Sequence, residues 1–260
     1  MSRSGLAVQV GMLARRSVVR TLRQPAMVVP SLFFPLLLLS INSSGLDSTT
    51  RLPGFPTDSY FQFALAIPFV QGALFSANSA GTNVASDIES GFLNRLALTP
   101  LRRVALMLGQ LAGILALGLI QAVTFVVVGV AFGSGIKAGV SGALVIVALS
   151  LTISLAFGCI GAFVALRSGT GEAVQGVFPL FFAALFLSSM SLPRDLIQTD
   201  WFRTVATYNP VSYMLEAIRS LVIEGWNPEA LALGFACAGG LAAIALVAAS
   251  AALRTRMVRT

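Results

Sequence analysis

Long uncharged stretches alternate along the chain with short charged segments. Asp, Glu, Lys and Arg are absent from six stretches of 21 to 33 residues, namely 24–46, 59–86, 104–136, 138–166, 173–193 and 230–253. A helix needs roughly 20 apolar residues to cross the hydrocarbon core of a bilayer. Each stretch therefore predicts one membrane span, and the predicted fold class is an all-α polytopic membrane protein with six transmembrane helices.

Composition supports a single membrane domain. Hydrophobic residues make up 56% of the chain and charged residues only 10%, whereas charged residues are about 25% of an ordinary soluble domain. The six spans use most of the 260 residues, and the segments between them are short. We therefore expect one transmembrane domain over residues 1–260, with no room for a separate soluble domain.

The basic residues lie mostly on one side of the predicted spans. If the N-terminus is cytoplasmic, 12 of the 17 basic residues lie on the inner side with three acids, and the other five lie outside with seven acids. Cationic segments stay in the cytoplasm, so both termini are predicted to be cytoplasmic. The net charge of +7 is thus mainly a topology signal, and nucleic acid is not an expected partner. The frequent Arg, Ala, Gly and Val with a single Lys indicate a GC-rich bacterial genome, and the expected location is a bacterial plasma membrane.

Residues 6–24 are predicted to form a helix before the first span. Arg16, Arg20 and Arg23 share one face of it, and apolar residues lie opposite. A helix with this division lies in the membrane interface, with its basic face toward anionic lipid headgroups. The alternative is a charged lead-in to the first span. Pro25 disfavours a continuous helix, so we expect the chain to turn into the first span there.

The second predicted span is the most polar. Gln71, Asn78 and Thr82 recur on one helical face. Side-chain amides are unfavourable in hydrocarbon unless they face protein or water. This face is therefore either part of a translocation path or a set of hydrogen bonds between helices.

The inner loop 86–101 has features of a docking helix. Ser86 and Glu89 have the spacing of a capping box, which predicts that a short helix begins there, and Pro100 ends it. An apolar patch toward the cytoplasm follows the cap: Phe92, Leu93 and Leu96. An apolar helix outside the membrane favours docking into a partner's groove. The alternative is that it lies on the membrane surface.

The outer segment 194–228 is too long for a simple turn. Asn209 is predicted to cap a helix whose first residue is Pro210. Glu216 and Arg219 have the i, i+3 spacing of an ion pair. An apolar stripe follows the cap: Val211, Leu215, Ile218 and Val222. We expect two short amphipathic helices that enter the outer leaflet as a re-entrant hairpin.

At these two segments the chain resembles the permease subunit of a type-2 ATP-binding cassette exporter. The family's inner pattern of an acid, a glycine, a spaced leucine and Thr-Pro is matched by Glu89, Gly91, Leu96, Thr99 and Pro100. Its outer pattern of Asn-Pro, an aromatic, Glu and Arg is matched by Asn209, Pro210, Tyr213, Glu216 and Arg219. A second acid common in the family is replaced here by Asn94. Among subclasses, the permeases of drug and antibiotic-resistance exporters are the most similar.

The resemblance implies a working unit of two permeases and two ATPase subunits in the membrane lipid. The inner loop and the helix 6–24, with Arg16 and Arg20, would contact the ATPase, and the outer helices would close the exit. The path would follow spans two and five, suited to a drug, antibiotic or lipid. In span five it would be lined by Phe178, Phe181, Phe182 and Leu185.

Several other functional classes are disfavoured because the sequence lacks the residues they require. The phosphate-binding pattern G-x-x-x-x-G-K-[ST] is absent, so no cofactor is expected here, the chain is not predicted to be an enzyme, and ATP and Mg²⁺ would bind the partner. Histidine is absent, and no metal site is expected. The uncharged spans argue against a proton-coupled pump. A polysaccharide or glycolipid permease of the same family, a passive channel or carrier, and a non-transporting assembly factor remain alternatives.

Overall fold

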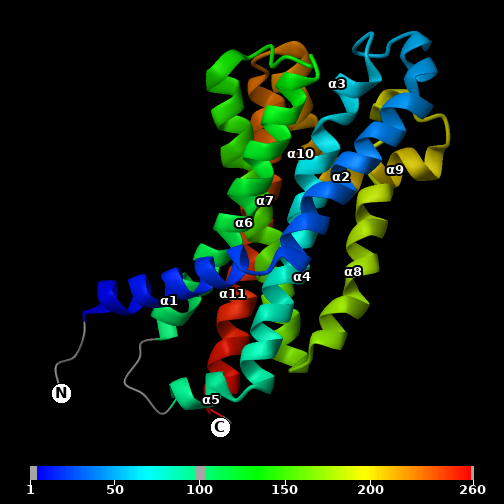
Figure 1. The fold of residues 1–260 in the computed structure, drawn as a ribbon. Coiled ribbons are helices and arrows are strands. Elements are labelled where there is room, and N and C mark those ends of the chain that lie inside the picture. The colour runs from blue at the N-terminus through cyan, green and yellow to red at the C-terminus, as the bar shows by residue number, and fades with distance from the viewer. Residues whose placement is uncertain (1–4, 98–102, 259–260) are drawn as a thin grey trace.

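The structure is a computed structural model that describes residues 5–97 and 103–258, and its regular elements in those ranges are all helices (Figure 1). The helices of 16 residues or more are α1 (Leu6–Leu22), α2 (Pro25–Gly45), α4 (Ala66–Glu89), α6 (Arg103–Ala131), α7 (Gly139–Ser168), α8 (Gly171–Phe186) and α11 (Pro228–Val258). The shorter ones are α3 (Tyr60–Ala64), α5 (Phe92–Ala97), α9 (Asp200–Tyr208) and α10 (Pro210–Arg219). Short 3₁₀ helices cover Asp47–Arg51 and Arg194–Leu196, and a π-helical segment covers Ser220–Glu224.

The predicted all-α polytopic architecture is confirmed. Five helical segments within the described ranges are long and apolar enough to cross a membrane: α2, the α3–α4 segment Tyr60–Glu89, α6, α7 and α11. The remaining uncharged stretch forms α8, which is apolar but has only 16 residues. The stretch 104–136 is not one helix, because α6 ends at Ala131 and two glycines with positive φ, Gly133 and Gly135, follow.

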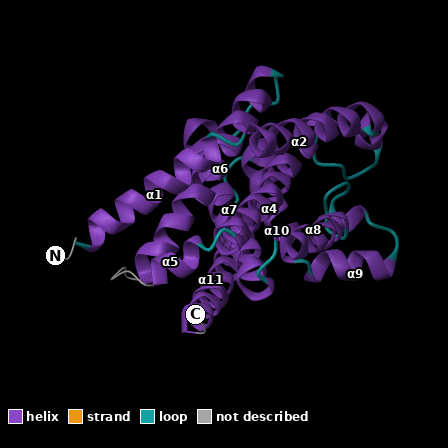
Figure 2. Ribbon diagram, turned by 60° about the horizontal axis from the view of Figure 1, so that its bottom comes forward, coloured by secondary structure: helices purple, strands orange, loops and turns teal. Residues whose placement is uncertain are grey.

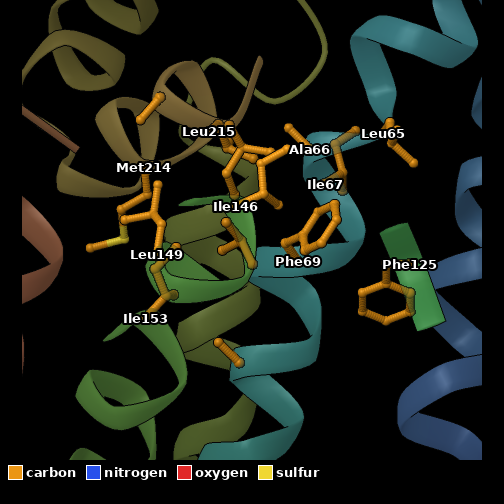
Figure 3. Close-up of a cluster of buried hydrophobic side chains, with 14 of the residues drawn as sticks. Leu65, Ala66, Ile67, Phe69, Phe125, Ile146, Leu149, Ile153, Met214 and Leu215 are labelled. Carbon is orange, nitrogen blue, oxygen red and sulfur yellow. The ribbon is translucent and has the colours of Figure 1, made fainter. Parts of the chain in front are cut away.

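The centre of the bundle is α4. In the most apolar part of the α3–α4 segment 83% of the residues are buried inside the protein, compared with 17% for α2 and 22% for α11. Figure 3 shows side chains of this segment meeting those of α6, α7 and α10. The labelled residues are Leu65, Ala66, Ile67, Phe69, Phe125, Ile146, Leu149, Ile153, Met214 and Leu215. The polar residues of α4 therefore lie within a protein environment.

The backbones of α4 and α7 touch at Gly161. A β-carbon on Gly161 would lie 1.9 Å from the main-chain oxygen of Ala77 and 2.7 Å from its carbonyl carbon. Small residues allow helices to approach this closely in membranes. Glycine is consequently required at this crossing.

We expect Gly161→Ala to destabilise the protein by more than the roughly 1–3 kcal/mol typical of overpacking, because the opposing atoms are main chain and cannot rotate away. Gly240→Ala in α11 is the matched control, since a β-carbon there meets no atom within 4 Å and alanine favours helix. The measurement is the midpoint of thermal unfolding in detergent. Equal midpoints for the two variants would contradict the crossing as described.

Two ends of the bundle can be distinguished in Figure 1. The end of α4, the short α5 and the end of α11 lie together at the bottom, which we call the α5 end. The opposite half, with α3, α9 and α10, is the α9 end. Helix α1 crosses the bundle instead of running along it, as Figure 2 also shows. The positions of α5 and α10 at opposite ends agree with the predicted inner and outer segments.

Candidate functional site

At the α5 end, Asp87 in the last turn of α4 accepts hydrogen bonds from two arginines of α1. Arg16 donates to Oδ1 at 2.8 Å and to Oδ2 at 3.2 Å, and Arg20 donates to Oδ1 at 2.7 Å. The side chain of Asp87 is only 11% exposed. The Arg16 guanidinium also lies 3.8 Å from the centre of the Phe92 ring. These contacts, which we call the Asp87 cluster, join α1, α4 and α5.

Two of the three arginines on the predicted basic face of α1 are directed at the protein, whereas Arg23 is exposed, and contact of this helix with lipid headgroups stays a prediction. Arg16 and Arg20 turn toward Asp87, while α1 lies against α6. Close contact between these helices depends on Gly113, where a β-carbon would lie 2.3 Å from the hydroxyl oxygen of Ser17. Periodicity identified the face correctly but could not show that an acid from a distant segment would meet it.

Glu89 links the same end to α8. The main-chain N–H of Gly171, the first residue of α8, donates to Glu89 Oε1 at 3.2 Å. The helix macrodipole favours a carboxylate at this position. The predicted capping box is wrong, because α4 continues through Glu89 and a new helix begins only at Phe92, after Gly91 with φ +67°.

The apolar side of α5 faces the protein's own interior. Leu93 is 4% exposed and packs in a buried cluster with Val84 and Leu253, and Leu96 packs against that cluster. Phe92, Leu93 and Leu96 also border a cavity of about 50 Å³ beside the Asp87 cluster. The predicted apolar patch is therefore wrong for Leu93, whereas Phe92 and Leu96 are partly exposed. Thr99 and Pro100 lie outside the described residues, and contact between this loop and an ATPase stays a prediction.

Midway along the bundle, phenylalanines of three helices contact one another. Ring centroids of successive members lie 5.2 to 6.4 Å apart. We call this set the aromatic patch: Phe34 of α2, Phe75 of α4, and Phe178, Phe182 and Phe186 of α8. Phe34 is 39% exposed and Phe186 is 54% exposed, so the patch forms part of the molecular surface.

The sequence identified only part of this patch. Phe178 and Phe182 belong to it, but the other two predicted lining residues face elsewhere. Phe181 makes an edge-to-face contact with Phe157 of α7 at 5.7 Å, and Leu185 is fully buried in the core. Phe34 and Phe75 were missed. A signal for Phe75 existed, since it lies at i+4 from Gln71 and so shares the polar face of α4.

The polar face of α4 carries acceptors without partners. Among the described residues, Gln71 Oε1 and Asn78 Oδ1 are buried and accept no hydrogen bond. Gln71 is only 1% exposed, while the Thr82 hydroxyl donates back to the Asn78 carbonyl at 2.8 Å. Hydrogen bonds between helices therefore do not account for these two oxygens, which lie on the face of α4 that also carries Phe75.

At the α9 end, Arg219 of α10 is buried among main-chain oxygens. It donates to the carbonyls of Phe63 at 3.0 Å, Ser189 at 2.6 Å and Met190 at 2.5 Å. Its guanidinium lies 3.7 Å from the centre of the Phe63 ring. Burial lowers the pKa of Arg219 to about 10, which leaves the side chain cationic at neutral pH.

Glu216 pairs with Arg194 and not with Arg219. Arg194 donates to Glu216 Oε2 at 2.5 Å and lies 4.5 Å from the centre of the Tyr213 ring. Both members of the pair are about one-quarter exposed, at 24% and 26%. The predicted Glu216–Arg219 pair is wrong, because Arg219 reaches toward α3 and the turn after α8 while Glu216 faces the segment before α9.

The predicted start of α10 is confirmed. Asn209 Oδ1 accepts from the main-chain N–H of Val211 at 2.9 Å, and Pro210 is the first helical residue. The Asn209 amide donates to the carbonyls of Ala184 at 2.6 Å and Leu187 at 3.1 Å. The predicted stripe is buried: Val211, Leu215, Ile218 and Val222. Helix α10 is accordingly covered by protein on this side.

A charged cavity of about 480 Å³ lies beside α10. Its lining includes three arginines and three acids: Arg194, Arg203, Arg219, Asp195, Glu216 and Glu224. The positive and negative charges are equal in number, so the cavity is polar but does not favour either anions or cations. Within residues 5–97 and 103–258, no three His, Cys, Asp or Glu side chains come together as metal ligands.

Comparisons with known proteins identify the family and several relatives. The family model for ABC-2 type transporters matches residues 8–223. The chain is 26% identical over 223 residues to a putative transport permease, ycf38, of Porphyra purpurea, covering 84% of this chain and 76% of the relative. It is 24% identical over 217 residues to the probable doxorubicin resistance ABC transporter permease protein DrrC of Mycobacterium tuberculosis, covering 81% and 75%.

Proposed function

The chain belongs to the ABC-2 type transporter family, and on that premise we propose that it is the membrane-spanning subunit of an exporter driven by a separate ATPase subunit. The partner would bind ATP and Mg²⁺. Two permease copies would form the path in a bacterial plasma membrane, with the α5 end and both termini cytoplasmic. The cargo would be a hydrophobic or amphiphilic molecule moved outward.

The observation that carries this proposal is the network at the α5 end. Asp87 connects α4 to α1, Arg16 of α1 contacts Phe92 of α5, and Glu89 connects the end of α4 to the start of α8. Helices α4 and α8 also carry most of the aromatic patch. We expect a displacement applied to α5 to reach, through these contacts, the helices that would contact cargo, as a permease powered from outside requires.

The aromatic patch and the polar face of α4 indicate the kind of cargo. We expect the rings to contact an apolar body, and the unpartnered oxygens of Gln71 and Asn78, buried in this arrangement, would accept hydrogen bonds from donors on the cargo once the helices move apart. Similarity to a probable doxorubicin resistance permease supports a drug-like cargo. We expect α9 and α10 to close the exit, with Arg219 and the Arg194–Glu216 pair holding the closed arrangement.

The proposal is tested by purifying the permease together with an ABC ATPase from the same organism. We expect the two to co-purify and, in vesicles, amphiphilic compounds to raise ATP turnover and to be transported. A permease that binds no ATPase and passes solutes without ATP would instead be a passive channel or carrier.

Within this complex we expect Phe182→Ala to weaken cargo binding by about tenfold or more, because an aromatic side chain contributes roughly 1.5–3 kcal/mol when buried. The measurement is the cargo concentration that half-stimulates ATP turnover. Phe181→Ala is the matched control on the same helix, since Phe181 contacts the core residue Phe157. Phe181→Ala should lower the unfolding midpoint and leave the cargo concentration for half-stimulation unchanged. If Phe181→Ala and not Phe182→Ala raised that concentration, the path would lie on the other face of α8.

A further inference from the structure

The last turn of α11 contacts the connection between α7 and α8. Arg256 Nη1 donates to the main-chain carbonyl of Leu166, in the last turn of α7, at 2.9 Å. A β-carbon on Gly169 would lie 2.8 Å from Arg256 Nη2. The guanidinium therefore lies directly against the backbone of this connection, residues 168–171, which we call the α7–α8 turn.

The backbone of the α7–α8 turn accommodates the guanidinium. Gly169 ends α7 with φ +85°, in the left-handed region, and its N–H donates to the carbonyl of Ala165 at 2.8 Å. The last carbonyls of a helix lack donors from their own helix and carry the negative end of its dipole. Arg256 supplies both a donor and a positive charge at that place, so α7 is capped by a side chain of α11.

The other end of the α7–α8 turn is held by α4. The N–H of Gly171 donates to Glu89 Oε1 at 3.2 Å, and the Thr170 hydroxyl accepts from the N–H of Ala173 inside α8. The turn thus has one contact with α11 where α7 ends and one with α4 where α8 begins. Because α8 starts in this turn, its position depends on both contacts.

The same turn of α11 also packs near α5. Leu253 is buried and belongs to one apolar cluster with Leu93 of α5 and Val174 of α8. Figure 1 shows the end of α11, in red, beside α5 at the α5 end. Arg256 follows Leu253 at i+3, so the two side chains leave neighbouring positions on one side of α11. One helical turn therefore supports α5 with an apolar residue and the α7–α8 turn with a charged one.

The neighbouring arginine has different surroundings. Arg254 is exposed, whereas Arg256 is partly buried. A basic residue that serves only to set the topology of a span has no need to contact a particular carbonyl, so the contact with Leu166 requires a separate explanation. Helix α11 also lies outside residues 8–223, which match the family model.

We propose that Arg256 is a positioning residue for α8, and that the last turn of α11 links α5 to the α7–α8 turn. A displacement of α5 then reaches α8 by two routes, one through Glu89 of α4 and one through α11. The position of the turn is a property of the permease alone. Its effect on ATP-driven transport rests on the proposed function.

Hydrogen exchange of the purified permease in detergent tests the position of the turn without an ATPase. In Arg256→Gln we expect the amides of residues 166–175 to exchange about tenfold faster, because the turn keeps only its contact with α4. Arg254→Gln is the matched control, since it removes an exposed charge from the same turn of α11, and should leave this exchange unchanged. Arg256→Lys keeps a charged donor and should restore most of the protection.

The same variants report on transport once an ATPase is bound. Arg256→Gln should lower the maximal cargo-stimulated ATP turnover by about fivefold. The cargo concentration for half-stimulation should not change, because Arg256 contacts the start of α8 and not the aromatic patch. A parent complex without cargo-stimulated turnover would contradict the proposed function, and the exchange measurement would still decide the present inference.

Two results of the exchange measurement would overturn the proposal. Equal exchange of residues 166–175 in Arg256→Gln and Arg254→Gln would show that Arg256 does not hold the turn. Faster exchange over the whole chain in Arg256→Gln, together with a lower unfolding midpoint, would show that Arg256 supports the fold in general and has no particular role in placing α8.

Discussion

Replacing Asp87 by alanine should uncouple the α5 end, lowering cargo-stimulated ATP turnover by tenfold or more and the free energy of unfolding by about 2–3 kcal/mol. The carboxylate separates two cations, and its removal leaves Arg16 and Arg20 facing each other without compensation. Breaking a fully buried ion pair costs roughly 3–5 kcal/mol, and the 41% exposure of Arg16 reduces that value here. ATP turnover and thermal unfolding of the purified complex measure the two effects.

A double variant and a control variant test the role of the Asp87 charge. Asp87→Asn combined with Arg20→Gln should be more stable than Asp87→Asn alone, because the double variant also removes one repelling charge. Asp200→Asn breaks the pair with Arg203, whose side chains are 88% and 47% exposed, and should change little. Equal losses from Asp87→Asn and Asp200→Asn would show that the Asp87 cluster has no special role.

Arg219→Ala should remove most of the folded protein. Three main-chain carbonyls would lose their donor, and each unsatisfied buried polar group costs about 1–3 kcal/mol. The sum is comparable with the roughly 5–15 kcal/mol that stabilises an ordinary domain. Recovery of monodisperse protein in gel filtration and the unfolding midpoint provide the measurement.

The neighbouring acid supplies the comparison for Arg219. Glu216→Gln breaks only the partly exposed pair with Arg194 and should alter stability by less than about 1 kcal/mol. Arg219→Lys keeps the charge but not the planar set of donors, so we expect incomplete recovery. Equal losses of stability in Glu216→Gln and Arg219→Ala would contradict this assignment. They would indicate that Glu216 and Arg219 form the ion pair predicted from their i, i+3 spacing.

Local signals in the sequence predicted the elements well. The long stretches without charged residues located the spans, because charged side chains are unfavourable wherever the chain crosses hydrocarbon. Asn209-Pro210 located the start of α10 because a cap and its first turn depend on adjacent residues only. The apolar stripe that includes Val211 and Leu215 was expected to enter the outer leaflet, but it packs inside the protein, because periodicity identifies an apolar face and not what covers it.

Long-range partners could not be predicted in the same way. Spacing allowed Glu216 to meet Arg219, but the carbonyls of Phe63 and Ser189, from other parts of the chain, are closer to that guanidinium. Asp87 is one of the three acids on the predicted inner side, but no partner was predicted for it, because its two arginines are 67 and 71 residues away. Phe181 and Phe182 are adjacent in sequence, and only tertiary packing decides which one turns toward α7.

The shortness of α8 has a consequence for the surrounding bilayer. Its 16 residues extend about 24 Å at 1.5 Å per residue, whereas the hydrocarbon core is roughly 30 Å thick. If α8 crosses the bilayer, we expect the lipids beside it to thin or tilt to match it, at a cost of fractions of a kcal/mol per Å. The two leaflets would then lie closer together along the helix that carries Phe178, Phe182 and Phe186 than along the longer α6 and α7. An amphiphile moving along α8 would have less hydrocarbon to cross than one moving along those two helices.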